Sequence, residues 1–270
     1  MPEDPVPEER PRALVFGEVA DLYDARRPDY PDELFDLVLT LAGHSERARV
    51  LDVGCGTGKA AVGFARRGAA VVGVEPNEAM AAVARRHLGA FPGCTVVSSR
   101  FEDWDGRAGS ADVVTAGQAW HWVDQDVGLA TAARVLGPGG VLALFWNAPR
   151  PEGTNLFEEV AAAYGREVPE LAEQGTVALR WSDDFIEQRQ RLATTGIFAP
   201  AVRHTWDWTK DYTTTGYVEL LQTHSDHRLL PPADLDRLLV AVAEVVDGAG
   251  GRITHGYRTH LVTAIRDGPG

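Results

Sequence analysis

Cysteine is scarce in this 270-residue chain, and no run of about 18 apolar residues, the length that spans a membrane, occurs in it. Cys55 and Cys94 could form one disulfide at most, and for a cytosolic protein free thiols are expected. No Cys/His cluster has zinc-ligand spacing, so we expect no metal. Residues 1–12 are acidic and proline-rich, whereas a signal peptide needs a basic start and an apolar stretch. We therefore expect a cytoplasmic protein without a membrane partner.

Positive charge is also in short supply, because 26 Lys and Arg residues stand against 39 Asp and Glu residues. The formal net charge of -13 opposes the counterion-release attraction that drives nucleic-acid binding, so we expect no nucleic-acid partner. The composition, 44% hydrophobic and 24% charged, is that of a globular protein and argues against a disordered or fibrous class. Nothing in the sequence indicates the oligomeric state.

Short, continuously apolar runs alternate with helical stretches through the first half of the chain. Strands without polar alternation are those buried on both faces, as in a parallel sheet covered by helices. A Gly-Pro-Gly-Gly segment at 137–140 predicts the turn from the last of these helices into the fifth strand. The pattern predicts a doubly wound, Rossmann-like α/β fold. The expected strands are 49–53, 70–74, 95–97, 111–116 and 140–146, and the expected helices are 59–67, 77–88 and 124–136.

The rest of the chain is expected to complete this core. Helical spacing of leucine and valine follows Pro31, and two late strands are expected at 201–208 and 252–265, with an amphipathic helix between them. Together these predict a mostly parallel, seven-stranded sheet with helices on both faces and a helical insertion or cap. The expected segments are a flexible tail at 1–12, an N-terminal segment with the first helix at 13–48, a core at 49–147, the insertion or cap at 148–200, and C-terminal strands and helices at 201–270.

The sequence Asp52-Val53-Gly54-Cys55-Gly56-Thr57-Gly58 joins the first expected strand to the helix after it. Open α/β sheets bind ligands at this carboxyl edge of the strands, and glycine lets the backbone turn tightly against a ligand. Asp52 is placed to hold water or an ammonium group. Dinucleotide loops have the spacing G-x-G-x-x-G and phosphate-binding loops end in G-K-[ST], and neither matches here.

The G-x-G-x-G spacing resembles instead the first motif of the class I methyltransferases that use S-adenosylmethionine (SAM) and release S-adenosylhomocysteine. In that family an acid after the second strand accepts the ribose hydroxyls, and Glu75 matches it. The resemblance also places an apolar contact to adenine at Met80 and an adenine-edge motif at 99–104. The cofactor-binding residues implied by the loop and the resemblance are Asp52, Gly54, Cys55, Gly56, Gly58, Glu75, Pro76, Met80, Phe101, Glu102 and Gln118.

Two further segments are similar to the branch of this family that is related to trans-aconitate methyltransferases. The first is Gly-Gln-Ala-Trp-His-Trp at 117–122, after the fourth strand, which in that branch lies near the transferred methyl group. The second is Tyr-Asp-Ala-Arg-Arg-Pro-Asp-Tyr-Pro at 23–31, which resembles an N-terminal lid. This resemblance adds Tyr23 and Arg27 to the implied cofactor-binding residues, with Arg27 pairing with the SAM carboxylate or, alternatively, lying solvated at the surface.

Methyl transfer from a sulfonium is an in-line displacement, so the main tasks are orientation and exclusion of water. A general base is needed only if the acceptor must lose a proton, and His121 is the candidate; the alternative is that it packs between two tryptophans. Aromatic residues at the same edge indicate a small, partly apolar acceptor with an O, N or C nucleophile. The implied substrate-pocket residues are Tyr30, Trp120, Trp122 and Trp146, for which ordinary packing is the alternative.

Two other functions remain open from the sequence. A glycine-rich loop followed by an acid also describes the NAD site of oxidoreductases, although the spacing differs. A SAM-binding module that has lost transfer activity would keep the same fold. Of these hypotheses, the motifs favour methylation of a small metabolite.

Overall fold

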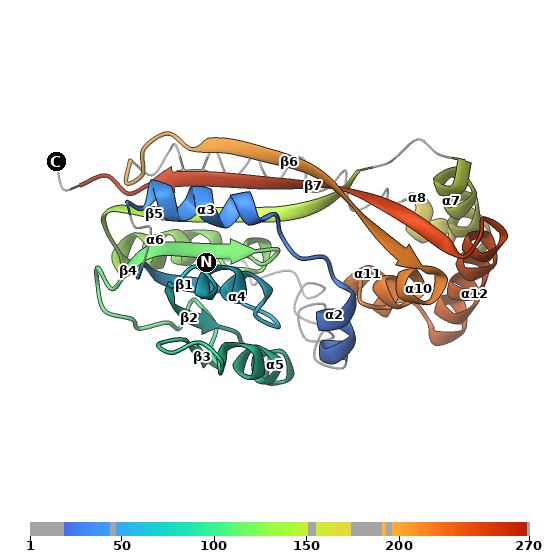
Figure 1. Ribbon diagram of the computed structural model, residues 1–270, viewed down its shortest axis with the longest axis horizontal. Helices are drawn as coiled ribbons and strands as arrows, with labels where there is room; N and C mark the ends of the chain where they lie inside the picture. Colours follow the sequence, from blue (N-terminus) through green and yellow to red (C-terminus); the bar gives the residue numbers. More distant parts are fainter. Residues whose placement is uncertain (1–18, 44–46, 151–154, 174–190, 193–195, 269–270) are drawn as a thin grey trace, which may run out of the picture. The chain divides into compact units, whose positions relative to one another are not determined.

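The computed structural model describes residues 19–43, 47–150, 155–173, 191–192 and 196–268 (Figure 1). A seven-stranded sheet with the strand order β3-β2-β1-β4-β5-β7-β6 runs through them. The predicted doubly wound fold with a seven-stranded, mostly parallel sheet is therefore confirmed. The strands are β1 Arg49–Val53, β2 Ala70–Val74, β3 Thr95–Val97, β4 Ala111–Gly117, β5 Leu136–Arg150, β6 Val202–Thr213 and β7 Arg252–Ile265.

Strands β1 to β5 form the parallel part of the sheet. Each hydrogen-bonded pair among them, β3-β2, β2-β1, β1-β4 and β4-β5, is parallel. In β1 the Cα of Asp52 pairs with Gly73 of β2 on one side and with Thr115 of β4 on the other. Asp52 thus lies in the centre of the sheet, one residue before the end of its strand.

The last two strands run antiparallel to one another. Along β6 the residue number rises from Asp207 to Asp211, while the hydrogen-bonded partners on β7 fall from Arg258 to Thr254. The arrows of β6 and β7 accordingly point in opposite directions in Figure 1. Polar residues alternate along β6, as expected for a strand at the edge of the sheet.

Two of the helices that follow parallel strands are capped by side chains at the ends of the connecting loops. The Asn77 side chain accepts hydrogen bonds from the first-turn amides of α5, and Asp124 does the same for α6. None of the described helices is long and apolar enough to cross a membrane. The main helices are α2 Ala20–Arg26, α3 Asp32–Leu41, α4 Lys59–Ala65, α5 Glu78–Leu88, α6 Gln125–Val135, α7 Asn155–Glu167, α8 Pro169–Glu173, α10 Thr214–Gln222, α11 Ser225–Arg228 and α12 Pro232–Gly248.

The chain divides into two compact units, and β5, β6 and β7 contribute residues to both. Among the described residues, unit 1 comprises 19–28, 148–150, 155–173 and 207–258, and unit 2 comprises 29–43, 47–147, 191–192, 196–206 and 259–268. The core of unit 1 is formed by apolar residues of α7, α10 and α12 with Tyr212, Ile253 and Tyr257. In unit 2, helices α3 to α6 lie beside the parallel strands, and the core is built around Phe35, Phe64 and Phe145 (Figure 1).

Several predicted boundaries differ from the structure. The fifth strand begins at Leu136 rather than Gly140, so the prediction that the segment 137–140 is a turn before the strand was wrong. The physical reason is pairing on both sides: Leu136 pairs with Ala111 of β4, and Gly139 and Gly140 exchange backbone hydrogen bonds with Arg266. Strand β6 extends to Thr213, five residues beyond its predicted end at Trp208. The predicted tail at 1–12 and most of the region 174–195 lie outside the described residues.

Candidate active site

The loop between β1 and α4 carries three glycines in the left-handed region of backbone space. Gly54, Gly56 and Gly58 have φ values of 60°, 56° and 89°. A Cβ on Gly54 would lie 2.6 Å from the Cβ of Ala119, and one on Gly58 would lie 3.2 Å from Ala84. Glycine is therefore required at both positions by the backbone conformation and by the packing of the neighbouring segments.

Asp52 lies beneath this loop with a fully buried carboxylate, at 0% exposure. Among the described residues, neither of its carboxylate oxygens accepts a hydrogen bond of ordinary geometry. Burial raises the pKa of Asp52 to about 8; the nearby backbone N–H of Ala61 opposes this rise, and the charge of Glu75 adds to it. A buried, unpaired carboxylate is costly in a protein interior and indicates a missing donor or cation.

Glu75 follows the end of β2 and reaches back to the glycine loop. Its Oε2 accepts a hydrogen bond of 2.9 Å from the backbone N–H of Gly56, and its Oε1 accepts one of 2.9 Å from Asn77. Burial raises the pKa of Glu75, and these two amides oppose the rise. The loop thus holds the Glu75 side chain in one orientation, next to the middle glycine.

Cys55 and Met80 complete the apolar lining of the loop. The Cys55 N–H donates a 3.1 Å hydrogen bond to Val74, and its side chain packs where a Cβ on Gly73 would otherwise lie. Met80, in the first turn of α5, is 4% exposed, and its Cε lies 3.5 Å from the position of a Cβ on Gly56. Pro76, also predicted from the sequence, is exposed beside Glu75.

Phe101 and Glu102 lie in the loop after β3. Phe101 is buried, and its ring centroid lies 6.1 Å from that of Trp120. Glu102 accepts hydrogen bonds from the Arg100 guanidinium at 3.1 Å and from the Asp124 backbone N–H at 3.0 Å. Burial raises the pKa of Glu102, but the hydrogen bonds from Arg100 and Asp124 together outweigh this effect, so its pKa lies below the ordinary value.

The segment after β4 places Gln118 in a strained conformation. Gln118 has a φ of 58°, which is rare for a residue with a side chain. Its backbone N–H donates to Phe145 at 2.9 Å, and its Nε2 donates to the carbonyl of Asn147 at 3.2 Å. Such strain at the end of a central strand is typical of a functional site.

Trp120, His121 and Trp122 form a short 3-10 helix after Gln118. Trp120 is fully buried, and its indole N–H has no hydrogen-bond partner among the described residues. The His121 ring lies 4.6 Å from the Trp122 ring, centroid to centroid. Burial lowers the pKa of His121 to about 3, so the imidazole is neutral at neutral pH. A pKa this low makes the His121 imidazole a weak proton acceptor.

Tyr30 and Trp146 pack inside unit 2. The Tyr30 ring meets the Phe145 ring edge-on at a centroid distance of 4.6 Å, and its hydroxyl would lie 2.8 Å from a Cβ on Gly117. Trp146 is 0% exposed in β5. Both residues contribute to the core, and Gly117 permits the close approach of Tyr30 to the end of β4.

Asn147 connects this site to its surroundings, and no sequence motif pointed to it. Its Nδ2 donates to the Asp29 carbonyl at 2.9 Å, and its Oδ1 accepts from the Thr259 hydroxyl at 2.6 Å. Its own carbonyl accepts from Gln118 at 3.2 Å. Asn147 is only 4% exposed, so these hydrogen bonds fix both the start of unit 2 and the loop after β4.

Tyr23 and Arg27, predicted from the lid motif, belong to unit 1. There the Arg27 guanidinium donates to the Thr223 carbonyl at 2.9 Å and lies over the Tyr23 ring at 5.1 Å. The structure therefore shows Arg27 holding the end of α10 within its own unit.

Comparison with known proteins assigns the chain to a family. Residues 51–144 match the family described as a methyltransferase domain. An uncharacterized methyltransferase of Mycobacterium tuberculosis is 33% identical over 216 residues, which cover 80% of this chain and 79% of that protein. The trans-aconitate 2-methyltransferase of Variovorax paradoxus is 36% identical over 121 residues, covering 44% of this chain and 46% of that enzyme.

A solved structure from Anaeromyxobacter dehalogenans, which carries the name of a type II methyltransferase, is also similar. It has a TM-score of 0.62 and 25% identity, and the match covers 90% of this chain and 99% of that one. The glycine loop from Gly54 to Gly58 and the acid Glu75 fall within the matched family region. With this loop, this sheet and relatives along most of its length, the chain belongs to the class I methyltransferases.

Proposed function

We propose that this protein transfers a methyl group from S-adenosylmethionine to a small, partly apolar molecule. The observation that carries the proposal is Asp52, a buried carboxylate that accepts no hydrogen bond of ordinary geometry from the described residues, below a loop of three left-handed glycines. An α-ammonium group supplies the cation that such a carboxylate lacks. The chemistry of the donor set therefore fits an aminoacyl nucleoside.

Glu75 is the residue that would hold the ribose of this cofactor. Each of its oxygens already accepts one backbone hydrogen bond, from Gly56 or Asn77, and each retains a lone pair. The two amides orient the carboxylate before the cofactor binds, so binding requires little ordering of this side chain. Met80 and Phe101 are the buried apolar residues that would contact adenine.

Bound SAM supplies a methyl group on a positively charged sulfur, ready for in-line displacement. The residues of the chain then have to orient the acceptor and exclude water. Gln118, held by Phe145 and Asn147, and the buried Trp120 form a rigid segment at the carboxyl end of β4, suited to this task. Orientation of this kind can lower a barrier by about 7–11 kcal/mol without covalent catalysis.

His121 is the candidate for handling the acceptor's proton. Its imidazole is neutral at pH 7 and can accept a hydrogen bond, but a pKa of about 3 makes full proton abstraction unfavourable. We therefore propose that His121 hydrogen-bonds the nucleophile and positions it, and takes its proton only as the methyl group is transferred.

The proposed acceptor is a small organic molecule. Aromatic groups around Gln118 and a net charge of -13 favour a small organic molecule over nucleic acid. One relative is named for trans-aconitate, which makes a small carboxylic acid a reasonable first acceptor to test. Family membership argues against the NAD-dependent alternative, because the match is to methyltransferases.

The test is isothermal titration of the purified chain with SAM, S-adenosylhomocysteine and NAD, followed by mass spectrometry of an acceptor panel incubated with isotope-labelled SAM. The proposal predicts saturable binding of the two sulfur compounds, no binding of NAD, and transfer of the labelled methyl group to one class of small molecule. Binding of SAM without transfer to any acceptor class would favour a non-catalytic module. Binding of NAD alone would overturn the proposal.

A further inference from the structure

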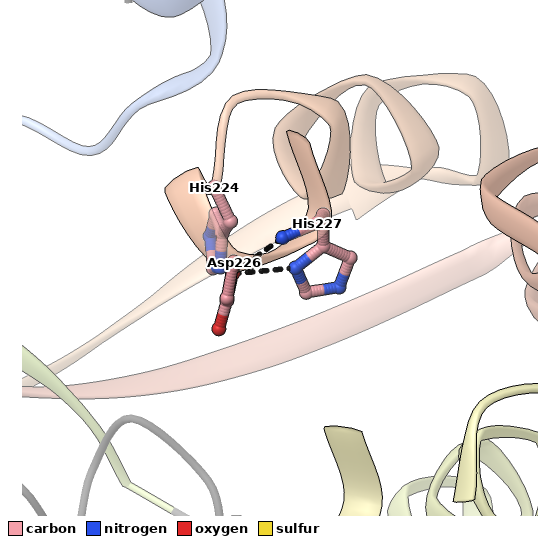
Figure 2. A group of neighbouring side chains, drawn as sticks. All are labelled: His224, Asp226 and His227. Atoms are coloured by element: carbon pink, nitrogen blue, oxygen red, sulfur yellow. Dashed lines mark hydrogen bonds and ion pairs between the residues drawn. The ribbon is translucent and has the colours of Figure 1, made fainter. Parts of the chain in front are cut away.

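Unit 1 contains a compact group of side chains of the types that bind metals, none of them part of the glycine loop. His224 precedes α11, and Asp226 and His227 lie within it (Figure 2). Figure 2 shows the three side chains converging at the start of this short helix. One ligand atom from each, two imidazole nitrogens and one carboxylate oxygen, can be chosen so that all lie within 4.8 Å of one another.

Asp226 and His227 are already hydrogen-bonded to each other. The Asp226 Oδ1 accepts hydrogen bonds from the His227 backbone N–H at 2.8 Å and from His227 Nδ1 at 2.7 Å. The His224 ring meets the His227 ring edge-on, with 5.3 Å between centroids. In the metal-free protein a single proton therefore lies between an imidazole nitrogen and a carboxylate oxygen, where a cation would be bound by both.

We propose that His224, Asp226 and His227 bind a divalent transition-metal ion, and that zinc is the preferred ion. Two imidazoles and one carboxylate are common zinc donors, and three protein ligands leave one position of a tetrahedral site for water. Oxygen-loving ions such as magnesium and calcium prefer sites with more carboxylate and carbonyl ligands. Ligand bonds of about 2.0–2.2 Å require only a small opening of the Asp226–His227 pair.

The surroundings of the three residues resemble those of established metal sites. A metal-binding histidine usually hydrogen-bonds a second group through its other ring nitrogen. His227 does so, because the Tyr164 hydroxyl lies 2.7 Å from its Nε2. When the metal takes Nδ1, the ring proton moves to Nε2 and is donated to the Tyr164 oxygen. The change is one of tautomer, and the imidazole stays neutral.

The backbone that carries these ligands is held in place. The His224 N–H donates to Leu221 at 3.1 Å, and the His224 carbonyl accepts from Arg228 at 3.0 Å. The preceding residue, Thr223, is fixed through its carbonyl by Arg27 and through its hydroxyl by Leu220. Such anchoring presents the ligands without a large ordering cost on metal binding.

The sequence does not predict this site, because no cysteine and histidine cluster in it has zinc-ligand spacing. The spacing His-x-Asp-His places ligands on one turn only, and the supporting Tyr164 is 63 residues away from His227. Tyr164 is brought next to His227 by the fold and not by a local sequence motif.

The experiment is metal binding by the untagged full-length chain after treatment with a chelator. Zinc is added in a calorimetric titration, and cobalt is added in parallel because its visible absorption reports a four-coordinate site. We expect a single zinc ion per chain, tetrahedral cobalt absorption, and a higher Tm with zinc.

Matched variants identify the ligands. His224→Ala and the nearly isosteric Asp226→Asn should each weaken zinc binding at least about 100-fold, and Tyr164→Phe should weaken it about 10-fold, as expected of the residue that orients His227. His204→Ala changes a histidine outside the cluster and should leave binding unchanged. Circular dichroism of each variant without metal shows whether it is folded. Absence of zinc and cobalt binding by the wild-type chain, or equal binding by folded Asp226→Asn and wild type, would overturn the proposal.

Discussion

The backbone N–H of Gly56 donates a 2.9 Å hydrogen bond to Oε2 of Glu75. The hydrogen bond joins the middle glycine of the β1–α4 loop to the acid at the end of β2, and a second one from Asn77 holds the other oxygen. The proposed ribose ligand is therefore part of the loop's own hydrogen-bond network. A change at either position should affect both the proposed cofactor site and the local stability.

Replacing the acid tests its role in cofactor binding. Glu75→Gln should raise the SAM Kd at least about tenfold, because it removes a charged acceptor whose hydrogen bonds contribute roughly 1.5–3 kcal/mol. The new amide group would also face a backbone N–H, so a lower Tm is expected. Isothermal titration and thermal unfolding measure the two effects. Glu78→Gln, an exposed neighbour on α5, is the matched control, and equal SAM affinities for the two variants would contradict the role of Glu75.

The close packing of the first glycine can be tested by a rescue experiment. Gly54→Ala combines a φ of 60° with a Cβ only 2.6 Å from Ala119, whereas Gly109→Ala has a similar φ of 65° and nothing within 4 Å. The left-handed conformation alone costs about 1–2 kcal/mol for alanine. The free energy of unfolding of Gly54→Ala should fall by about 1–3 kcal/mol more than that of Gly109→Ala.

Adding Ala119→Gly to Gly54→Ala removes the clash and should restore most of that excess. Urea denaturation of the single and double variants measures each difference. If Gly54→Ala and Gly109→Ala are equally destabilised, the loop does not pack against Ala119 as described.

If Asp52 pairs with the cofactor ammonium as proposed, SAM binding should depend on pH. Its pKa of about 8 means that the carboxyl is protonated near pH 6 in the free protein. The folded pKa is above the unfolded value, so the contribution of Asp52 to stability is fully present below the unfolded pKa and is lost as the pH rises towards 8. An ammonium group favours the ionised form, so binding of SAM should release a proton.

Titrations at pH 6 in buffers with different ionisation enthalpies count the protons released. The wild-type chain should release close to one proton more than Asp52→Asn, in which the group cannot ionise. The same number of protons for both proteins would show that the cofactor ammonium does not pair with Asp52.

His121 should influence turnover more than cofactor affinity. We expect His121→Ala to lower kcat at least about tenfold with little change in the SAM Kd, because the proposed role of His121 is to position the acceptor. The pKa of about 3 predicts that this residue adds no acidic limb to the kcat profile between pH 5 and 8. Steady-state rates across that range, with an acceptor identified from the labelled panel, measure both. An unchanged kcat in the variant, or a limb near pH 6.5 that disappears with His121, would contradict this role.

The parallel core could be predicted from the sequence because β1, β2 and β4 are short, apolar and largely buried. The predicted bounds of β1, β2, β3 and β7 agree with the structure. The start of β5 could not be predicted, because Gly139 and Gly140 read locally as a turn and become strand only through Arg266, far along the chain. Tertiary pairing overrides local preference there.

In the candidate site too, local motifs could be predicted from the sequence and long-range contacts could not. The glycine loop and Glu75 are contiguous motifs, so their positions followed from spacing. The Asn147 hydrogen bonds to Asp29 and Thr259, and the Tyr164 contact with His227, join residues far apart in sequence. Side chains whose roles depend on such pairings carry no local signal.

A crystal structure of the protein with S-adenosylhomocysteine tests the central claim most directly. We predict the nucleoside along the loop from Gly54 to Gly58, both ribose hydroxyls within about 2.6–3.2 Å of the Glu75 carboxylate, and the α-ammonium paired with Asp52, directly or through one water. A nucleoside bound elsewhere, with Glu75 contacting only Gly56 and Asn77 and Asp52 still without a partner, would contradict it.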